Sequence, residues 1–154
     1  MKPTSTLLLI EKAVELKSIS LFSETPESVV AEIAHLIHEM EIPSGTEVFH
    51  EGETGTCMYV IYKGKIKIHR GGQELAVLGE KDFFGELSML DTEMRSASAT
   101  AINDCLLFRI DQNSFYDLME TRPEVVKGII KVLCKRLREM NEKITLLKRE
   151  ATSA

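Results

Sequence analysis

The spacing of hydrophobic residues changes twice along this chain, and that change most constrains its fold. Residues 6–17 and the segment that begins at Thr25 carry apolar residues at helical intervals. From Val48 to Ile110 the pattern becomes a series of short alternating or wholly apolar runs, bounded by turn residues. Helical spacing returns after residue 111. This order predicts an α+β fold in which helices flank one β-roll.

The expected helices have recognisable ends. Thr25 is expected to cap the second helix, because Pro26 then occupies the first helical position, where its missing N–H costs nothing. Asp111 is expected to cap a later helix over residues 112–120, and Pro123 precedes the longest periodic segment, 124–148. The apolar face of the second helix is expected to comprise Val29, Val30, Ile33, Ala34, Ile37 and Met40.

The central part of the chain predicts strands joined by tight turns. Gly71-Gly72 lies between two strand-like runs and is typical of a two-residue hairpin, because both glycines tolerate a positive φ. Short, closely spaced strands of this kind indicate a small sandwich or roll. The expected strands cover 48–49, 58–62, 65–69, 75–78, 98–102 and 106–110.

Length and charge limit the possible functions. The 154 residues suit one domain with a single core. The net charge of −5 is unevenly distributed, since acidic residues predominate in 1–126 and basic residues in 127–154. The body of the domain therefore repels nucleic acid, and any anion must be captured by a local group of residues.

Nothing in the sequence suggests export or a disulfide framework. The longest aliphatic run, Leu7 to Ile10, is too short to span a bilayer and lacks a secretory cleavage site. Cys57, Cys105 and Cys134 are odd in number and far apart, so we expect reduced thiols and no zinc site. We therefore expect a soluble, cytoplasmic protein without membrane insertion, or the cytosolic domain of a larger one.

The segment 82–100 carries the residues best suited to binding a ligand. Gly85 allows close backbone approach, and Glu86 is a hydrogen-bond acceptor at neutral pH. Arg95 follows nine residues after Glu86, and small residues come directly after it. A guanidinium can hold a phosphate through two hydrogen bonds, and free N–H groups at Ser96 and Ala97 would add an anion-binding nest.

This segment resembles the phosphate-binding cassette of the cyclic nucleotide-binding domain family. Phe84-Gly85-Glu86-Leu87-Ser88 and then Arg95-Ser96-Ala97-Ser98 match the family pattern with the usual spacing. A second stretch, Glu51 to Ile61 followed by Gly64 and Ile66, resembles the glycine pattern of the family's β-roll. The resemblance runs from about Leu16 to about Leu137. It implies an eight-stranded antiparallel, jelly-roll-like β-roll between N-terminal helices and a long C-terminal helix.

The resemblance also implies a role for each matched residue. Arg95 would pair with the cyclic phosphate of cAMP or cGMP, and Glu86 would accept a hydrogen bond from the ribose 2′-hydroxyl. Backbone groups of Gly85, Leu87, Ser96 and Ala97 would complete the cage, and Phe84 is also expected at the ligand site. Thr56 and Lys81 stand where the family commonly has aspartate and glycine, which we interpret as changes in turn chemistry.

The C-terminal helix carries an apolar stripe with alternating spacings of four and three. The stripe comprises Val126, Ile130, Leu133, Leu137, Met140, Ile144 and Leu147. It is expected either to pack on the roll or to pair, over Met140 to Leu147, with a second copy or a parent protein as a weak contact. The resemblance implies a lid, with Leu133, Arg136 and Leu137 beside the base, that closes when ligand binds.

The expected plan has four parts. An N-terminal helical segment is expected over residues 1–24, followed by the roll over 25–122 with the cassette at 82–100. The lid helix is expected over 123–148, and a disordered tail over 149–154. No cofactor other than the nucleotide ligand is expected.

Three alternatives contrast with a cyclic nucleotide sensor. A metal enzyme would need clustered ligands, whereas His50 and His69 are isolated and His35 and His38 are expected on a helix surface. No nucleophile elbow or P-loop appears, so we expect no enzyme. A fragment of a transcription regulator is possible, although no helix-turn-helix follows by residue 154, so this chain is not expected to bind nucleic acid. The third is a degenerate domain that serves as a protein scaffold. We favour cAMP over cGMP, although the Ser96 hydroxyl could favour guanine.

Overall fold

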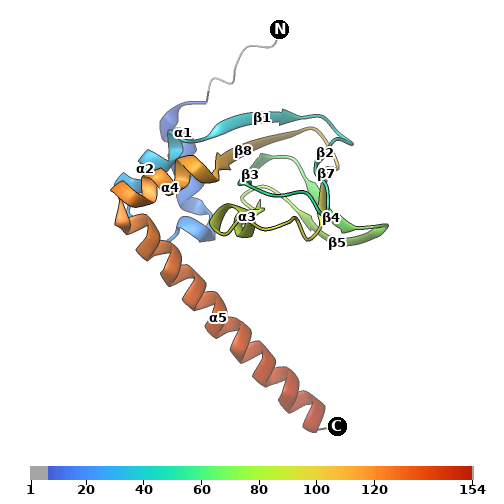
Figure 1. Ribbon diagram of the computed structural model, residues 1–154. Coiled ribbons are helices and arrows are strands. Elements are labelled where there is room, and N and C mark those ends of the chain that lie inside the picture. The colour runs from blue at the N-terminus through green and yellow to red at the C-terminus, as the bar shows by residue number, and fades with distance from the viewer. Residues whose placement is uncertain (1–6, 154) are drawn as a thin grey trace.

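The computed structural model describes residues 7–153, apart from the side chain of Leu87. It shows the expected α+β arrangement, with a two-sheet roll, helices packed at one end and a long helix leaving it (Figure 1). The helical elements are α1 (Leu9–Ser18), η1 (Ser20–Phe22), α2 (Glu27–Ala34), α3 (Glu86–Leu90), α4 (Gln112–Thr121) and α5 (Pro123–Thr152). The strands are β1 (His38–Ile42), β2 (Glu47–Phe49), β3 (Cys57–Lys63), β4 (Ile66–Arg70), β5 (Gln73–Leu78), β6 (Phe83–Phe84), β7 (Ser98–Ala101) and β8 (Cys105–Asp111).

The eight strands form two four-stranded antiparallel sheets, which confirms the predicted roll. One sheet has the order β1-β8-β3-β6, and the other has the order β2-β7-β4-β5. The strand β7 therefore lies between β2 and β4, and the cassette enters the second sheet at its centre. The segment that precedes β7 therefore lies between the ends of β2 and β4.

Turn chemistry explains two features noted in the sequence. Gly71 and Gly72 join β4 to β5, which confirms the predicted hairpin, and of the two glycines Gly71 alone takes a positive φ, at 60°. Lys81 has a φ of 72°, in the left-handed region that favours glycine. The lysine therefore occupies a strained turn two residues before the start of β6, which is a physical reason for the glycine common at this place in the family.

The predicted second helix is wrong beyond Ala34. Instead of extending to Met40, the chain enters β1, and Met40 pairs with Leu107 of β8. Pairing with β8 overrides the local helical spacing, because it satisfies the backbone groups of residues 38–42 in the sheet. His35 ends the helix, and His38 lies on β1, where its Nε2 is 3.3 Å from Asp111 Oδ2.

Thr25 is not the cap that the sequence predicted. Pro26 holds the N-cap position, and Thr25 is fully buried with a hydroxyl that makes no hydrogen bond within residues 7–153. Gly128 of α5 explains this placement. A Cβ at Gly128 would lie 2.7 Å from the Thr25 hydroxyl oxygen, so α5 packs on this turn where its side chain is smallest.

The α5 helix packs on the body through a different face from the one predicted. Its buried residues are Val125, Gly128, Ile129 and Val132. In the predicted stripe, by contrast, Val126 is 36% and Ile130 is 54% exposed. Of the stripe residues Val126, Ile130 and Leu133, Leu133 alone packs against the buried core, so the surface that joins α5 to the body is mainly a different one.

The helix also continues through residues 149–152, where we had expected a tail. The helix ends at Thr152. The Thr152 hydroxyl and the Ser153 N–H both donate hydrogen bonds to the Arg149 carbonyl oxygen. Residue 154 lies outside the described residues. Within residues 7–153, no helix combines the length and apolar character needed to cross a membrane.

Candidate functional site

The two sequence motifs, far apart in the chain, hold each other in place. The loop 50–56 runs beside the cassette, and three backbone hydrogen bonds join them. The Gly52 N–H donates to the Arg95 carbonyl at 2.8 Å, the Arg95 N–H to the Glu53 carbonyl at 2.7 Å, and the Gly55 N–H to the Glu93 carbonyl at 3.0 Å. The glycine motif therefore positions the backbone on both sides of Arg95.

Arg95 is a buried cation without an acidic partner. Only 6% of the residue is exposed, and no ion pair within residues 7–153 involves it. One terminal nitrogen donates to the Cys57 carbonyl at 2.9 Å, the other to the Gly85 carbonyl at 3.4 Å. Its guanidinium carbon lies 4.1 Å from the centre of the Phe49 ring. A buried charge held only by neutral groups is costly, and an anion would offset that cost.

Two glycines leave room for the guanidinium. A Cβ at Gly55 would lie 2.5 Å from Arg95 Nε, and a Cβ at Gly85 would lie 2.6 Å from a terminal nitrogen. Gly85 also has a φ of 79°, which side chains rarely adopt. Gly55 and Gly85, one from each motif, are therefore required by the position of one arginine.

A cavity of about 750 Å³ lies beside this arginine. Glu86, at the start of α3, lines it, and its carboxylate has no hydrogen bond or ion pair within the described part of the chain. Ser96 and Ala97 also line it, and no bond within residues 7–153 uses their N–H groups. The full lining comprises Phe49, Ile68, Phe83, Phe84, Gly85, Glu86, Ser88, Leu90, Asp91, Glu93, Met94, Arg95, Ser96, Ala97 and Leu133.

An aromatic cluster supports one wall of the cavity. Phe84 stacks on Tyr59 with ring centres 5.2 Å apart, and Phe49 packs against both rings. Burial raises the pKa of the Tyr59 hydroxyl, and a hydrogen bond with Cys57 raises it further. Tyr59 therefore stays neutral and acts as a structural support for Phe84.

The expected lid residues differ in their relation to the cavity. Leu133 lines it. Arg136 does not, but its guanidinium carbon lies 5.2 Å from the centre of the Phe83 ring, and it donates to the Ser20 hydroxyl at 3.3 Å. Leu137 is 59% exposed and lies outside the lining. The structure thus brings together Leu133 and the predicted cassette residues other than Leu87, whose side chain is not described, with Arg136 one side chain away and Leu137 apart.

Sequence reasoning missed several residues of the site. Phe49 supplies the ring under Arg95, and Cys57 supplies the carbonyl that accepts from it. Ile68 and Met94 also line the cavity. Phe49 and Ile68 lay within predicted strands, but no motif pointed to a ligand wall, and the sequence does not show which backbone carbonyl will accept a hydrogen bond.

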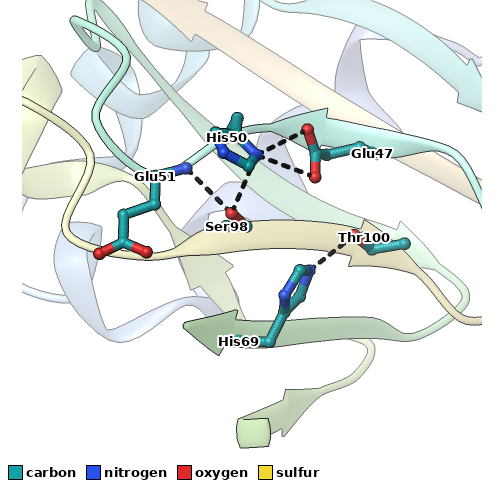
Figure 2. A network of polar contacts seen from close by, with 6 residues as sticks. All are labelled: Glu47, His50, Glu51, His69, Ser98 and Thr100. Atoms are coloured by element: carbon teal, nitrogen blue, oxygen red, sulfur yellow. Dashed lines mark hydrogen bonds and ion pairs between the residues drawn. The ribbon is translucent and has the colours of Figure 1, made fainter. Parts of the chain in front are cut away.

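The histidines of the roll belong to polar contacts on its surface (Figure 2). His50 Nδ1 lies 3.2 Å from Glu47 Oε1 and 3.5 Å from the Ser98 hydroxyl, whereas His69 Nε2 lies 2.8 Å from the Thr100 hydroxyl. Among residues 7–153, no group of three or more metal-ligating side chains is arranged to hold a metal ion. The Ser98 hydroxyl also accepts from the Glu51 N–H at 2.9 Å, so this network anchors the end of the cassette.

One cavity of this β-roll thus combines a buried arginine, an unpaired glutamate and free backbone N–H groups, and these features suit a small anionic ligand. The chain belongs to the cyclic nucleotide-binding domain family, whose model matches residues 39–122. This membership confirms the resemblance of the cassette and the glycine motif.

Several similar proteins are bacterial regulators. The chain is 34% identical over 129 residues to a CRP-like cAMP-activated global transcriptional regulator of Mycobacterium tuberculosis, covering 80% of this chain and 58% of the relative. It is 35% identical to the cyclic AMP receptor protein of Thermus thermophilus, covering 79% and 58%. The N-terminal domain of a Streptomyces coelicolor transcriptional regulator superposes with a TM-score of 0.76 at 32% identity, covering 84% of this chain and 93% of that domain. The chain thus spans 58% of the length of both regulators.

Proposed function

We propose that this chain is a sensor domain that binds cAMP in preference to cGMP, catalyses no reaction, and passes on the binding event through α5. One observation carries the proposal. Arg95 is buried without an acidic partner, and it shares a cavity with the unpaired carboxylate of Glu86. A ligand that is an anion at one end and a hydroxyl donor at the other fits both groups.

The phosphate would bind at Arg95. Its guanidinium is already held by the Cys57 and Gly85 carbonyls and by the Phe49 ring, so the side chain loses little conformational freedom on binding. The N–H groups of Ser96 and Ala97 have no partner within residues 7–153 and would complete the cage. Gly85, whose carbonyl accepts from Arg95, and Leu87 of α3 would add further backbone contacts with the ligand.

Glu86 selects the form of the nucleotide. Its carboxylate would accept a hydrogen bond from the ribose 2′-hydroxyl, which a 3′,5′-cyclic nucleotide leaves free. Asp91 and Glu93 also line the cavity, so three acidic residues accompany one arginine there. This balance favours the single charge of a cyclic phosphodiester over the multiple charges of a nucleoside polyphosphate.

The preference for cAMP rests on the relatives. The Mycobacterium regulator is named as cAMP-activated and the Thermus protein as a cyclic AMP receptor, each at 34% identity or more. The Ser96 hydroxyl is the feature that would favour cGMP, because it could accept from the guanine amino group. Direct competition between the two nucleotides decides this point.

The lid is the second part of the proposal. Leu133 already lines the cavity, and Arg136 packs on Phe83, which also lines it. A bound base would add contacts with this turn of α5 and with Leu137. Because ligand would then bind the closed arrangement more tightly, the equilibrium of the helix would shift toward it.

The exposed stripe on α5 suggests how the signal leaves the domain. Leu137, Met140, Ile144 and Leu147 are each 48–60% exposed and share one helical face. We expect this face to pair weakly with a second copy or to contact a parent protein in the cytoplasm. The relatives favour the ligand-binding part of a transcription regulator as the parent.

Calorimetry on the refolded, ligand-stripped protein tests the proposal. We expect micromolar or tighter binding of cAMP, weaker binding of cGMP, and losses in Arg95→Ala of roughly 30-fold to several-thousand-fold. Arg149→Ala, an exposed arginine on α5, is the matched control and should bind as the unmodified protein does. A folded protein that gives no heat with either nucleotide would contradict the proposal and favour the alternative of a protein scaffold.

A further inference from the structure

Arg70 contacts the cassette without contacting the cavity. It is the last residue of β4, its side chain is 55% exposed, and it does not line the cavity. Its Nε donates a hydrogen bond to the Ser96 carbonyl at 2.9 Å. The residue therefore touches the segment that follows Arg95 from outside the ligand site.

This hydrogen bond holds the part of the segment that the loop 50–56 leaves free. The Gly52 N–H binds the Arg95 carbonyl, and the Glu51 N–H binds the Ser98 hydroxyl (Figure 2). Both contacts come from the β2 side. Between them, the Ser96 carbonyl is held by Arg70 from the β4 side, and within residues 7–153 no other group binds it.

The geometry of the peptide group gives this contact a consequence for the ligand. The Ser96 carbonyl and the Ala97 N–H belong to one planar unit, and no peptide bond within residues 7–153 is cis. In a trans peptide these two groups point in opposite directions, so a bond that fixes the carbonyl also fixes the N–H. The Ala97 N–H has no partner within the described residues, and Ala97 lines the cavity.

We propose that Arg70 is a positioning residue that orients the Ser96–Ala97 peptide and so holds the Ala97 N–H ready for the ligand phosphate. The inference rests on the proposed function, because it assumes that the anion in this cavity is the phosphate of a cyclic nucleotide.

A simple surface ion pair does not account for the contact. Arg70 Nε is 3.8 Å from Glu51 Oε2, and both side chains are more than 40% exposed. Exposed pairs of this kind contribute little to stability. The shorter contact, with the Ser96 carbonyl, is the one that gives Arg70 a fixed orientation.

The test compares Arg70→Met with Lys67→Met. Both variants remove one positive charge from β4, but within residues 7–153 no hydrogen bond or ion pair involves the Lys67 side chain. We expect Arg70→Met to weaken cAMP binding about tenfold, the loss of roughly one hydrogen bond to a charged group, and Lys67→Met to change it less than about twofold. Arg70→Lys keeps a donor and should recover part of the loss. Equal affinities in the two methionine variants would overturn the inference.

A second measurement separates orientation from general loosening. The two phosphorothioate diastereomers of cAMP each replace one exocyclic oxygen with sulfur, a weaker hydrogen-bond acceptor. If Arg70 aims one N–H at one oxygen, Arg70→Met should change the ratio of the two affinities. If both diastereomers weaken by the same factor, Arg70 has only a structural role and the inference fails.

A third measurement needs no nucleotide. In ligand-free protein labelled with ¹⁵N, Arg70→Met should shift the Ala97 amide resonance and speed its hydrogen exchange, whereas Lys67→Met should not. An unchanged Ala97 amide in Arg70→Met would overturn the inference whatever the domain binds. Failure of the unmodified protein to bind either nucleotide would instead overturn the proposed function.

Discussion

The cassette and the distal half of α5, residues 137–152, differ in how firmly the rest of the molecule holds them. Backbone bonds from the loop 50–56, a side chain from β4 and the Phe49 ring all fix residues 93–98. In the distal half of α5 every residue is exposed, and the helix extends away from the body (Figure 1). The structure therefore holds the cassette in place from several sides, whereas the distal half of α5 has no residue buried against the body.

The largest expected effect is on stability and contrasts the two regions directly. Phe108 is fully buried on β8, where it stacks on Tyr62 with ring centres 5.0 Å apart. We expect Phe108→Ala to lower the free energy of unfolding by about 3–5 kcal/mol, because it leaves a cavity in the core. Leu147→Ala, at a side chain 60% exposed, should change it by less than about 0.5 kcal/mol. Urea denaturation followed by circular dichroism measures both.

Concentration dependence supplies the control for that comparison. Leu147→Ala could lower the free energy of unfolding by much more than about 0.5 kcal/mol, by an amount that grows with protein concentration. That result would show that the distal half of α5 is packed against a second copy in solution. An equally large loss of unfolding free energy that does not depend on concentration would show that the distal half of α5 packs on its own domain.

The next prediction concerns the glycine that makes room for Arg95. In Gly55→Ala the new Cβ would lie 2.5 Å from both Arg95 Nε and Ser88 Oγ, so the guanidinium must move. We expect nucleotide affinity to fall by about 10- to 100-fold, or roughly 1.4–2.8 kcal/mol, while the domain stays folded. Gly72→Ala is the matched control, because nothing lies within 4 Å of the position that its Cβ would take. Equal affinities in the two variants would show that the position of Arg95 is not what the glycine protects.

The fold could be predicted from sequence where local patterns and tertiary pairing agree. Most strands alternate or are wholly apolar, so their positions followed from the pattern. The strand β1 did not, because its sequence, HEMEI, continues the helical spacing of α2, and only its pairing with β8 makes it a strand. The face of α5 was mispredicted for a related reason. The regular stripe through Val126 and Ile130 is the more obvious pattern, but Gly128 decides which face packs on the turn at Thr25.

The residues around the cavity also fall into two groups, those that a sequence motif indicates and those that only the assembled fold brings together. Glu86 and Arg95 could be found because the motif fixes residue types at a fixed spacing. The contacts that hold Arg95 could not, because they come from a ring on β2 and from backbone carbonyls on β3 and before α3. Arg70 belongs to this second group. Its role depends on β7 lying between β2 and β4, which is a property of the assembled sheet.

The smallest expected effect tests whether α5 responds to the ligand at all. The chain has no tryptophan, so a single introduced indole reports on its surroundings without background. Leu137 is 59% exposed and lies one helical turn beyond Leu133, which lines the cavity. In Leu137→Trp we expect nucleotide to shift the emission to shorter wavelength and to protect the indole from an aqueous quencher, because closure would cover it.

Leu147→Trp is the control that keeps this test specific, since Leu147 is similarly exposed at 60% but lies farther along the same stripe. Its emission should not change if closure is confined to the part of α5 near the cavity. A change at both positions would mean that ligand alters the contacts of the whole distal half, as expected if nucleotide controls pairing with a second copy. No change at either, in a protein that binds nucleotide, would show that the cassette works without a lid and that the signal leaves the domain by another surface.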